Sequence, residues 1–202
     1  MNRQEGSVYI ENAQRTYEVD IDSLRDQMLE AMRVLGCAHW DVCLQLTTDR
    51  VVRKLNAQYR GKRKSTDILS FPFHELAHQP GELPKVHHPD EMNLGDMVVS
   101  LPYVDRQCHR DEEEQRELGE ATERGVSGAM AGVFSVQERL PLLVTHGLCH
   151  LLGHDHETDE DYERMVAAEE MVLRELGWPS PSSPSSSAAA AAASPINDAR
   201  QS

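Results

Sequence analysis

The stretch that most constrains this chain runs from Thr145 to His156 and has the sequence THGLCHLLGHDH. His146 and His150 are four residues apart, so on a helix their imidazoles lie on one face and can share a metal ion. Gly153 can adopt a positive φ, which would end the helix and turn the chain back. That turn would bring His156 to the same point. The stretch therefore predicts a three-histidine metal site on a central helix and the turn after it.

Three neutral imidazoles leave a fourth tetrahedral position open, which is typical of a catalytic zinc. The residues before the site, 140–144, are largely apolar, and burying imidazoles without partners is costly. This favours a metal ligand role over two core histidines, with one zinc per chain. Cys149 lies off the face shared by the histidines and is expected to be a small core residue. Spacing alone leaves His154 open as an alternative to His156.

The same spacing occurs in zinc proteases with the pattern H-E-x-x-H-x-x-G-x-x-H, with one critical difference. Those proteases carry a glutamate general base where this chain has Gly147. Without that carboxylate, peptide hydrolysis lacks its proton acceptor. The metal ligands thus indicate a hydrolase, and the glycine argues against a metalloprotease.

Composition limits the classes of partner and the compartment. The formal net charge of −14 gives no global basic field to attract nucleic acid, although phosphate binding depends on local patches. The four cysteines have no paired short spacing, which argues against a disulfide framework. No apolar stretch approaches the ~18 residues that span a membrane, and no secretory signal is apparent. We expect a soluble intracellular protein that does not bind membranes.

Hydrophobic periodicity predicts short strands alternating with helices. The expected strands are Ser7–Asn12 with Thr16–Val19 around a turn, Trp40–Leu46, Thr66–Phe71 and Asn93–Ser100. Helices are expected from Asp22 as cap to about Leu35, from about 48 to 59, from Leu101 onward, across the histidine stretch, and from about 159 to 176. The fold class is α/β or α+β, with a mixed sheet of about four strands packed with helices.

One domain is expected over residues 1–177, with two segments set apart by composition. Residues 111–135 begin with an acidic run and continue with glycines and small residues, so we expect an exposed acidic insertion. Residues 178–202 are rich in Ser, Pro and Ala and lack the apolar content to fold, so we expect a disordered tail.

Three blocks of the chain resemble a known family. Residues 146–156 closely resemble H-G-x-L-H-L-x-G-x-D-H, the signature of the YbeY family of metal-dependent endoribonucleases. Residues 56–71 are similar to its N-x-x-Y-R…T-D-V-L-S-F block, and residues 93–100 to its L-G-D-I-x-I-S block. The resemblance covers about residues 8–177. The departures are Cys149, the acidic insertion and the tail, and none of them removes a ligand.

The resemblance implies both a fold and an activity. It implies a mixed four-stranded sheet, a zinc held by His146, His150 and His156, and cleavage of phosphodiester bonds in single-stranded RNA. It also implies work in ribosomal RNA processing and ribosome maturation, with ribosomal RNA and the small subunit or its proteins as partners. The compartment would be a mitochondrion or another organelle in a eukaryote, and the cytoplasm otherwise.

The resemblance places Arg60 at the metal cleft, because the family's arginine follows the N-x-x-Y block. A guanidinium near an open zinc can bind a phosphodiester bidentately and stabilise its transition-state charge, so Arg60 is the candidate catalytic and substrate-binding residue. Residues 60–64 carry four cations in five positions. Lys62 and Arg63 would extend this phosphate-binding track.

The residues that would orient the imidazoles and move protons are less well defined by the sequence. Asp67 and Asp155 are candidates to orient the histidines, but each is equally suited to a turn or a cap. No general base is identifiable from sequence. The alternative function is therefore a non-catalytic ribosome-assembly or RNA-binding factor whose zinc stabilises the fold.

Overall fold

The computed structural model describes residues 5–75, 79–118 and 125–179, which contain a single four-stranded sheet. Its strands are β1 (Val8–Asn12), β2 (Asp41–Thr47), β3 (Ile68–Pro72) and β4 (Asn93–Ser100). They lie in the order β1-β2-β4-β3, where β1, β2 and β4 are parallel and β3 is antiparallel to β4. The mixed four-stranded sheet and the α/β class are confirmed.

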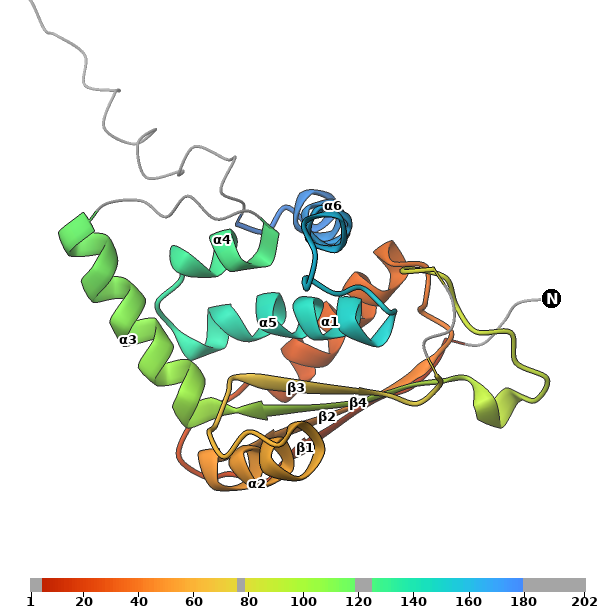
Figure 1. Ribbon diagram of the computed structural model, residues 1–202, viewed down its shortest axis with the longest axis horizontal. Coiled ribbons are helices and arrows are strands. Elements are labelled where there is room, and N and C mark those ends of the chain that lie inside the picture. Colours follow the sequence, from red (N-terminus) through yellow and green to blue (C-terminus); the bar gives the residue numbers. More distant parts are fainter. Residues whose placement is uncertain (1–4, 76–78, 119–124, 180–202) are drawn as a thin grey trace, which may run out of the picture.

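The helices form layers on both faces of the sheet. They are α1 (Ile21–Val34), α2 (Asp49–Arg60), α3 (Leu101–Leu118), α4 (Gly125–Ala131), α5 (Val136–Leu151) and α6 (Asp159–Leu176), with a short 3₁₀ helix at Pro89–Glu91. Helix α2 covers one face, while α1 and α5 cover the other, with α4 and α6 outside α5 (Figure 1). Helix α5 is therefore enclosed between the sheet and the outer helices.

The main core lies between the sheet and α5. The alternation from Trp40 to Leu46 is confirmed, because Trp40, Val42, Leu44 and Leu46 are all nearly inaccessible to solvent. Helix α5 is apolar on most of its surface because it has neighbours on several sides, and it buries eleven residues. Within the described residues, no helix has the length and apolarity that crossing a membrane requires.

Two local expectations near the N-terminus were wrong. Residues 16–19 form no strand, because Gln14 closes a loop there: its Oε1 accepts hydrogen bonds of 2.8 Å from the backbone N–H groups of Thr16 and Tyr17. The cap of α1 is Asp20 rather than Asp22, and its side chain accepts from the N–H of Ser23. Both features depend on which side chain accepts the hydrogen bonds of the backbone N–H groups.

The expected exposed insertion at 111–135 matches the described residues only in part: residues 113, 114, 116 and 117 are exposed, whereas Val126, Ala129 and Val133 are buried. Residues 111–118 continue α3, and Asp111 forms a 2.8 Å ion pair with Arg139, whose side chain is only 3% exposed. Helix α4 buries Val126 in a cluster with Leu142 of α5 and Leu173 of α6. The segment is thus tied into the helical layers. Residues 119–124 and the expected tail from 180 onward lie outside the described residues.

Candidate metal centre

Three histidines converge at the C-terminal end of α5. One ring nitrogen from each of His146, His150 and His156 lies within 4.8 Å of the others. The rings of His146 and His150 are one helical turn apart, with centroids separated by 4.7 Å. The His156 ring lies 5.8 Å from the first and 5.2 Å from the second. The structure therefore brings together the three residues that the sequence selects.

The turn after α5 carries His156 back toward the helix. Gly153 has a φ of 85°, in the left-handed region that favours glycine, as the sequence predicts. The backbone N–H of Gly81 donates a 2.9 Å hydrogen bond to the carbonyl of Leu152. Asp155 accepts a 2.8 Å hydrogen bond from the N–H of His156, so its carboxylate shapes the turn and orients no imidazole. These bonds fix the path of the chain between the second and third histidines.

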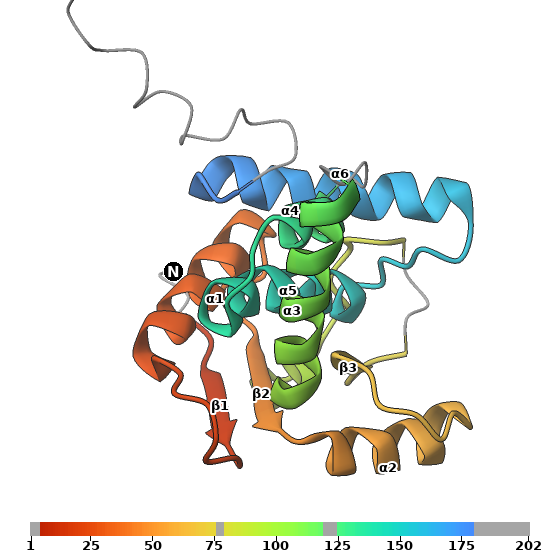
Figure 2. The ribbon, with the colours of Figure 1, turned by 90° about the vertical axis from the view of Figure 1, so that its left-hand side faces the viewer.

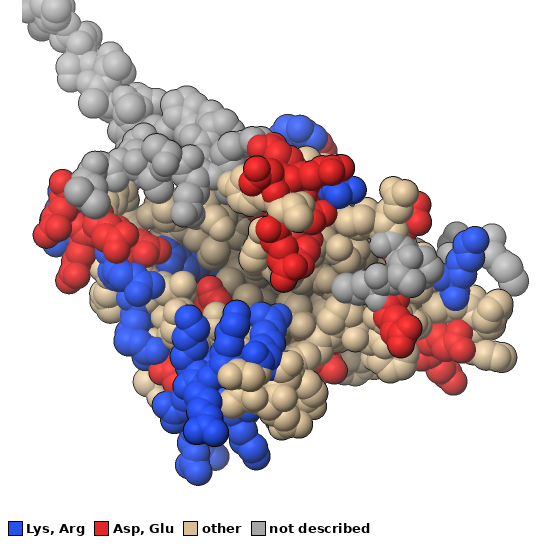
Figure 3. Space-filling view, viewed as in Figure 1, with Lys and Arg blue, Asp and Glu red and all other residues tan. Residues whose placement is uncertain are grey.

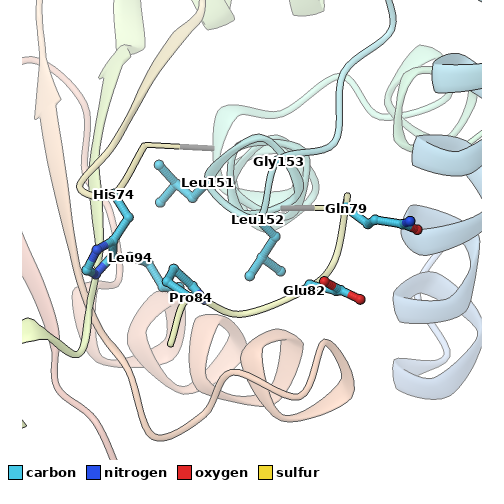
Figure 4. A pocket seen from close by; sticks show the side chains of 8 residues that line it. All are labelled: His74, Gln79, Glu82, Pro84, Leu94, Leu151, Leu152 and Gly153. Carbon is cyan, nitrogen blue, oxygen red and sulfur yellow. The ribbon is translucent and has the colours of Figure 1, made fainter. Parts of the chain in front are cut away.

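A pocket beside the turn shows how the end of α5 is supported (Figure 4). Its walls are His74, Gln79, Glu82, Pro84, Leu94, Leu151, Leu152 and Gly153. The side chain of Leu152 points toward the segment that carries Glu82 and Pro84. The segment before β4 therefore packs against the turn without entering the three-histidine group.

His154, the alternative third ligand, belongs to this packing. Its Nε2 lies 3.4 Å from the position that a side-chain carbon would occupy at Gly81. Its Nδ1 is buried and has no hydrogen-bond partner among the described residues, and burial lowers the pKa of the ring. His154 lies outside the group of three. The geometry therefore favours His156 as the third ligand.

The hydrogen bonds of His146 and His150 define their tautomers. Nδ1 of His146 lies 2.7 Å from Oε1 of Glu169, and Nδ1 of His150 lies 3.0 Å from the backbone carbonyl of His154. Both partners are acceptors, so each Nδ1 carries a proton and leaves Nε2 as the nitrogen that can bind a metal. The two Nε2 atoms are 3.2 Å apart. At this separation they can share one proton as a hydrogen bond or face a common cation.

The protonation of His150 suits the same role. Burial, together with the neighbouring His146, lowers its pKa to about 4, so the ring is neutral near pH 7. A neutral imidazole is the form that binds metal. The donor set of three imidazole nitrogens thus fits a zinc-type ion.

Glu169 is the residue of this centre that sequence reasoning missed. It lies on α6, is only 4% exposed, and its second oxygen accepts a 2.9 Å hydrogen bond from the N–H of Val126. A buried carboxylate that receives an imidazole N–H holds the ring orientation and raises its basicity as a ligand. The sequence did contain an indication of this role: Glu169 is a charged residue on the otherwise apolar face of α6, between Val166 and Val172.

Asp67 and Cys149, which the sequence analysis also considered, have structural roles. Asp67 accepts hydrogen bonds from the Thr66 hydroxyl and from the N–H of Ile68, at 2.9 and 2.8 Å, so it shapes the start of β3. Cys149 is fully buried, and burial raises the pKa of its thiol. The expectation that this cysteine is a core residue is confirmed.

Gly147 lies where α5 packs closely against the sheet, and it also replaces the glutamate of the zinc proteases. A side-chain carbon at this position would lie 2.6 Å from both the Ile68 and the Met97 side chains. A glutamate at this position would therefore require the Ile68 and Met97 side chains to shift. Ser70 on β3 donates a 3.3 Å hydrogen bond to the carbonyl of Gly147 at this contact. The glutamate that acts as the general base in the zinc proteases is replaced here by Gly147.

The predicted cationic residues lie on the surface at and after the C-terminal end of α2. Arg60 is the last residue of α2 and is exposed, as are Lys62 and Arg63 after the left-handed Gly61. The C-terminal end of α2 and the segment that joins α5 to α6 both extend toward the right-hand side in Figure 2. Lys and Arg side chains gather over α2, while acidic side chains gather over α6 and the end of α3 (Figure 3).

Comparison with known proteins identifies the family. The model of the family described as Endoribonuclease YbeY matches residues 9–177 of the chain. The chain belongs to the YbeY family. The match spans every strand and helix of the described fold except the first residue of β1, so all three histidines and Glu169 lie within it.

Curated YbeY relatives match over most of their own length. The human protein named Endoribonuclease YbeY is 32% identical over 171 residues, covering 85% of this chain and 89% of the relative. Its namesake from Nautilia profundicola is 34% identical over 164 residues, covering 81% and 88%. The namesake from Desulforamulus reducens is 36% identical over 137 residues, covering 68% and 72%. The family resemblance seen in the sequence is confirmed.

Proposed function

We propose that this protein is a zinc-dependent endoribonuclease that cleaves single-stranded RNA during ribosomal RNA processing and ribosome maturation. His146, His150 and His156 would hold one zinc ion per chain. The relatives above are named endoribonucleases, which supports an RNA substrate and a hydrolase that acts on phosphodiester bonds. We place the activity in one domain that ends near Gly177, where the family match ends.

The observation that carries the metal assignment is the convergence of one ring nitrogen from each of His146, His150 and His156, all within 4.8 Å of one another. A bound zinc would supply Lewis-acid polarisation of a phosphoryl oxygen and activation of a water or a ribose 2′-hydroxyl. The chain supplies the geometry: Glu169 and the His154 carbonyl hold two rings in the ligating tautomer. His156 completes the group from the turn.

Arg60 is the proposed partner of the scissile phosphate. Its planar guanidinium can donate two parallel hydrogen bonds to a phosphodiester, which a point charge cannot do. As charge grows on the phosphoryl oxygens, these bonds strengthen and lower the barrier. Lys62 and Arg63 would hold neighbouring phosphates without regard to sequence.

A single strand suits a site divided between a turn and a separate surface loop. An unpaired strand can bend so that one phosphate reaches the three-histidine group while its neighbours reach the cations after α2. An A-form duplex is stiff and is recognised mainly by its shape across the minor groove. We therefore expect duplex RNA to be a poor substrate.

The test is cleavage of labelled RNA by protein of defined metal content. The protein is stripped with a chelator and reloaded with zinc, then offered a single strand, the matching duplex and casein. We expect cleavage of the single strand only after reloading, slow cleavage of the duplex, and no casein hydrolysis. RNA binding without any cleavage under all metal conditions would instead indicate an assembly factor. Its main activity would then be binding to the ribosomal small subunit, which co-sedimentation measures.

A further inference from the structure

Two aromatic rings are exposed near the C-terminal ends of α2 and β3. Tyr59 is 62% exposed and Phe73 is 58% exposed. The Tyr59 ring packs edge-on against Phe71 of β3, with centroids 5.1 Å apart. Phe73 follows Phe71 by two residues, and its N–H donates to the carbonyl of Leu94. Tyr59 is thus supported by a second ring while much of its surface faces solvent.

Tyr59 directly precedes Arg60, within a stretch that is dense in cations. Residues 50–64 contain no aspartate or glutamate in a chain with a net charge of −14. The cations of this stretch are Arg50, Arg53, Lys54, Arg60, Lys62, Arg63 and Lys64. All are exposed, and none forms an ion pair with a described residue. Figure 3 shows the basic side chains gathered on this part of the surface.

Strand β3 connects the rings with the metal centre. Ser70 contacts the carbonyl of Gly147, the residue next to His146, on the α5 side of the sheet. Phe71, the next residue, faces the opposite side, where it packs with the cluster under α2. Because β3 is an edge strand, no other strand of the described residues covers this border of the sheet. A strand of RNA that follows this edge could reach both places.

We propose that Tyr59, supported by Phe71, and Phe73 form a stacking platform for the bases of the RNA strand whose phosphates bind the cations after α2. The proposal rests on the proposed function. Every base has a π face, so stacking on aromatic rings tolerates any sequence, and it requires unpaired bases. Cations and exposed rings together are the usual components of single-strand binding sites. An acidic protein partner would need the cations but not the rings.

The test compares a strand that has bases with one that lacks them. Zinc-loaded full-length protein is titrated with labelled single-stranded RNA and with an abasic strand of equal length, with strand integrity checked by gel. Tyr59→Leu keeps an apolar contact with Phe71 but removes the ring. Tyr59→Phe keeps the ring. The matched control is Tyr9→Leu, because Tyr9 is 60% exposed and lies on β1, at the opposite edge of the sheet.

We expect Tyr59→Leu to weaken binding of the base-containing strand by about fivefold or more, since stacking contributes roughly 1–3 kcal/mol per base. Phe73→Leu should act in the same direction, while Tyr59→Phe and Tyr9→Leu should bind normally. The abasic strand should bind all variants equally. If Tyr59→Leu behaves like Tyr9→Leu while RNA cleavage persists, the platform is wrong and the nuclease assignment stands. If the parent neither binds nor cleaves RNA, both fail.

Discussion

The two regions assigned to RNA cleavage are built in opposite ways. At the metal centre, the rings of His146 and His150 are held by hydrogen bonds of 2.7 and 3.0 Å, one of them to the buried Glu169. In the loop after α2, Arg60 and Lys62 are exposed and form no ion pair with the described residues. A metal site requires fixed donors, whereas a flexible strand is best met by side chains that can adjust. The difference predicts which substitutions affect chemistry and which affect binding.

The largest effect is expected at Arg60, the one exposed cation assigned to the reacting phosphate. Arg60→Ala should keep metal and fold and bind RNA within several-fold of the parent, but cleave it ~10²–10³ times more slowly, the usual cost of losing one donor to the transition-state charge, here a donor that the bound phosphate orders. Arg60→Lys should rescue poorly, because an ammonium cannot form the bidentate pair. Single-turnover cleavage beside equilibrium RNA binding measures both quantities.

Lys62→Ala is the matched control for Arg60, since both cations belong to one exposed loop. It should weaken binding slightly and flatten the salt dependence of binding by about one unit or less, with the cleavage step unchanged. Equal losses of binding and cleavage in Arg60→Ala would reduce Arg60 to an anchoring residue like Lys62. The distinction between chemistry and binding within this loop would then disappear.

A smaller effect is expected at Glu169, on the fixed side of the comparison. The carboxylate accepts from His146 at one oxygen and from the Val126 N–H at the other. In Glu169→Gln only one acceptor oxygen remains, so either the His146 Nδ1–H or the Val126 N–H must face an amide NH₂, and the negative charge beside the ring is lost in both cases. Metal affinity should fall roughly 10- to 100-fold, as for other residues that orient a metal ligand. Competition with a chromophoric chelator measures this directly.

Glu160→Gln controls for the loss of a negative charge on α6, because the Glu160 side chain is 82% exposed. It should leave metal affinity unchanged. If both substitutions have equal effects, the general charge of α6 matters and the hydrogen bond to His146 does not. If neither has an effect, the carboxylate only joins α4 to α6.

The last prediction concerns stability: the free energy of unfolding of the metal-free protein should depend on pH through His150. The pKa of His150 is lowered from 6.5 to about 4, mainly by burial. Between these values the unfolded chain binds a proton that the folded chain does not, so the free energy of unfolding of metal-free protein rises with pH. The contribution is at most about 3 kcal/mol, and less because the ring is partly exposed to solvent; it should be lost as pH falls from 6.5 toward 4. Urea unfolding at several pH values in this range measures the free energy of unfolding. That free energy should change less with pH in His150→Gln than in the parent.

The contrast between the regions also explains what the sequence could predict. The three-histidine group depends on helical spacing and on one glycine with φ 85°, which are local properties of residues 146–156. The alternation of β2 and the bounds of β4, Asn93–Ser100, are local in the same sense. Patterns of this kind carry their own geometry, so they could be predicted from a single sequence.

Two differences arose where distant residues decide the structure. The acidic residues 113, 114 and 117 are exposed as expected, but Asp111 pairs with the buried Arg139 and Val126 packs against α5 and α6. Glu169 acts on His146 from 23 positions away, and only the folded chain places them together. Contacts between partners far apart in sequence are not visible in local periodicity. Thr16–Val19 failed for a local reason: it suits a strand by composition, but the side chain of Gln14, two and three residues away, accepts from the backbone N–H groups of Thr16 and Tyr17.

The central claim is that His146, His150 and His156 together hold the metal that RNA cleavage requires. The most direct test is elemental analysis of the purified parent beside the variants His156→Ala and His154→Ala. The parent should carry about one zinc per chain, His156→Ala should lose most of it, and His154→Ala should keep it. Full metal in His156→Ala together with loss in His154→Ala would contradict the assignment of the third ligand. Absence of metal from all three after zinc reloading would contradict the metal centre itself.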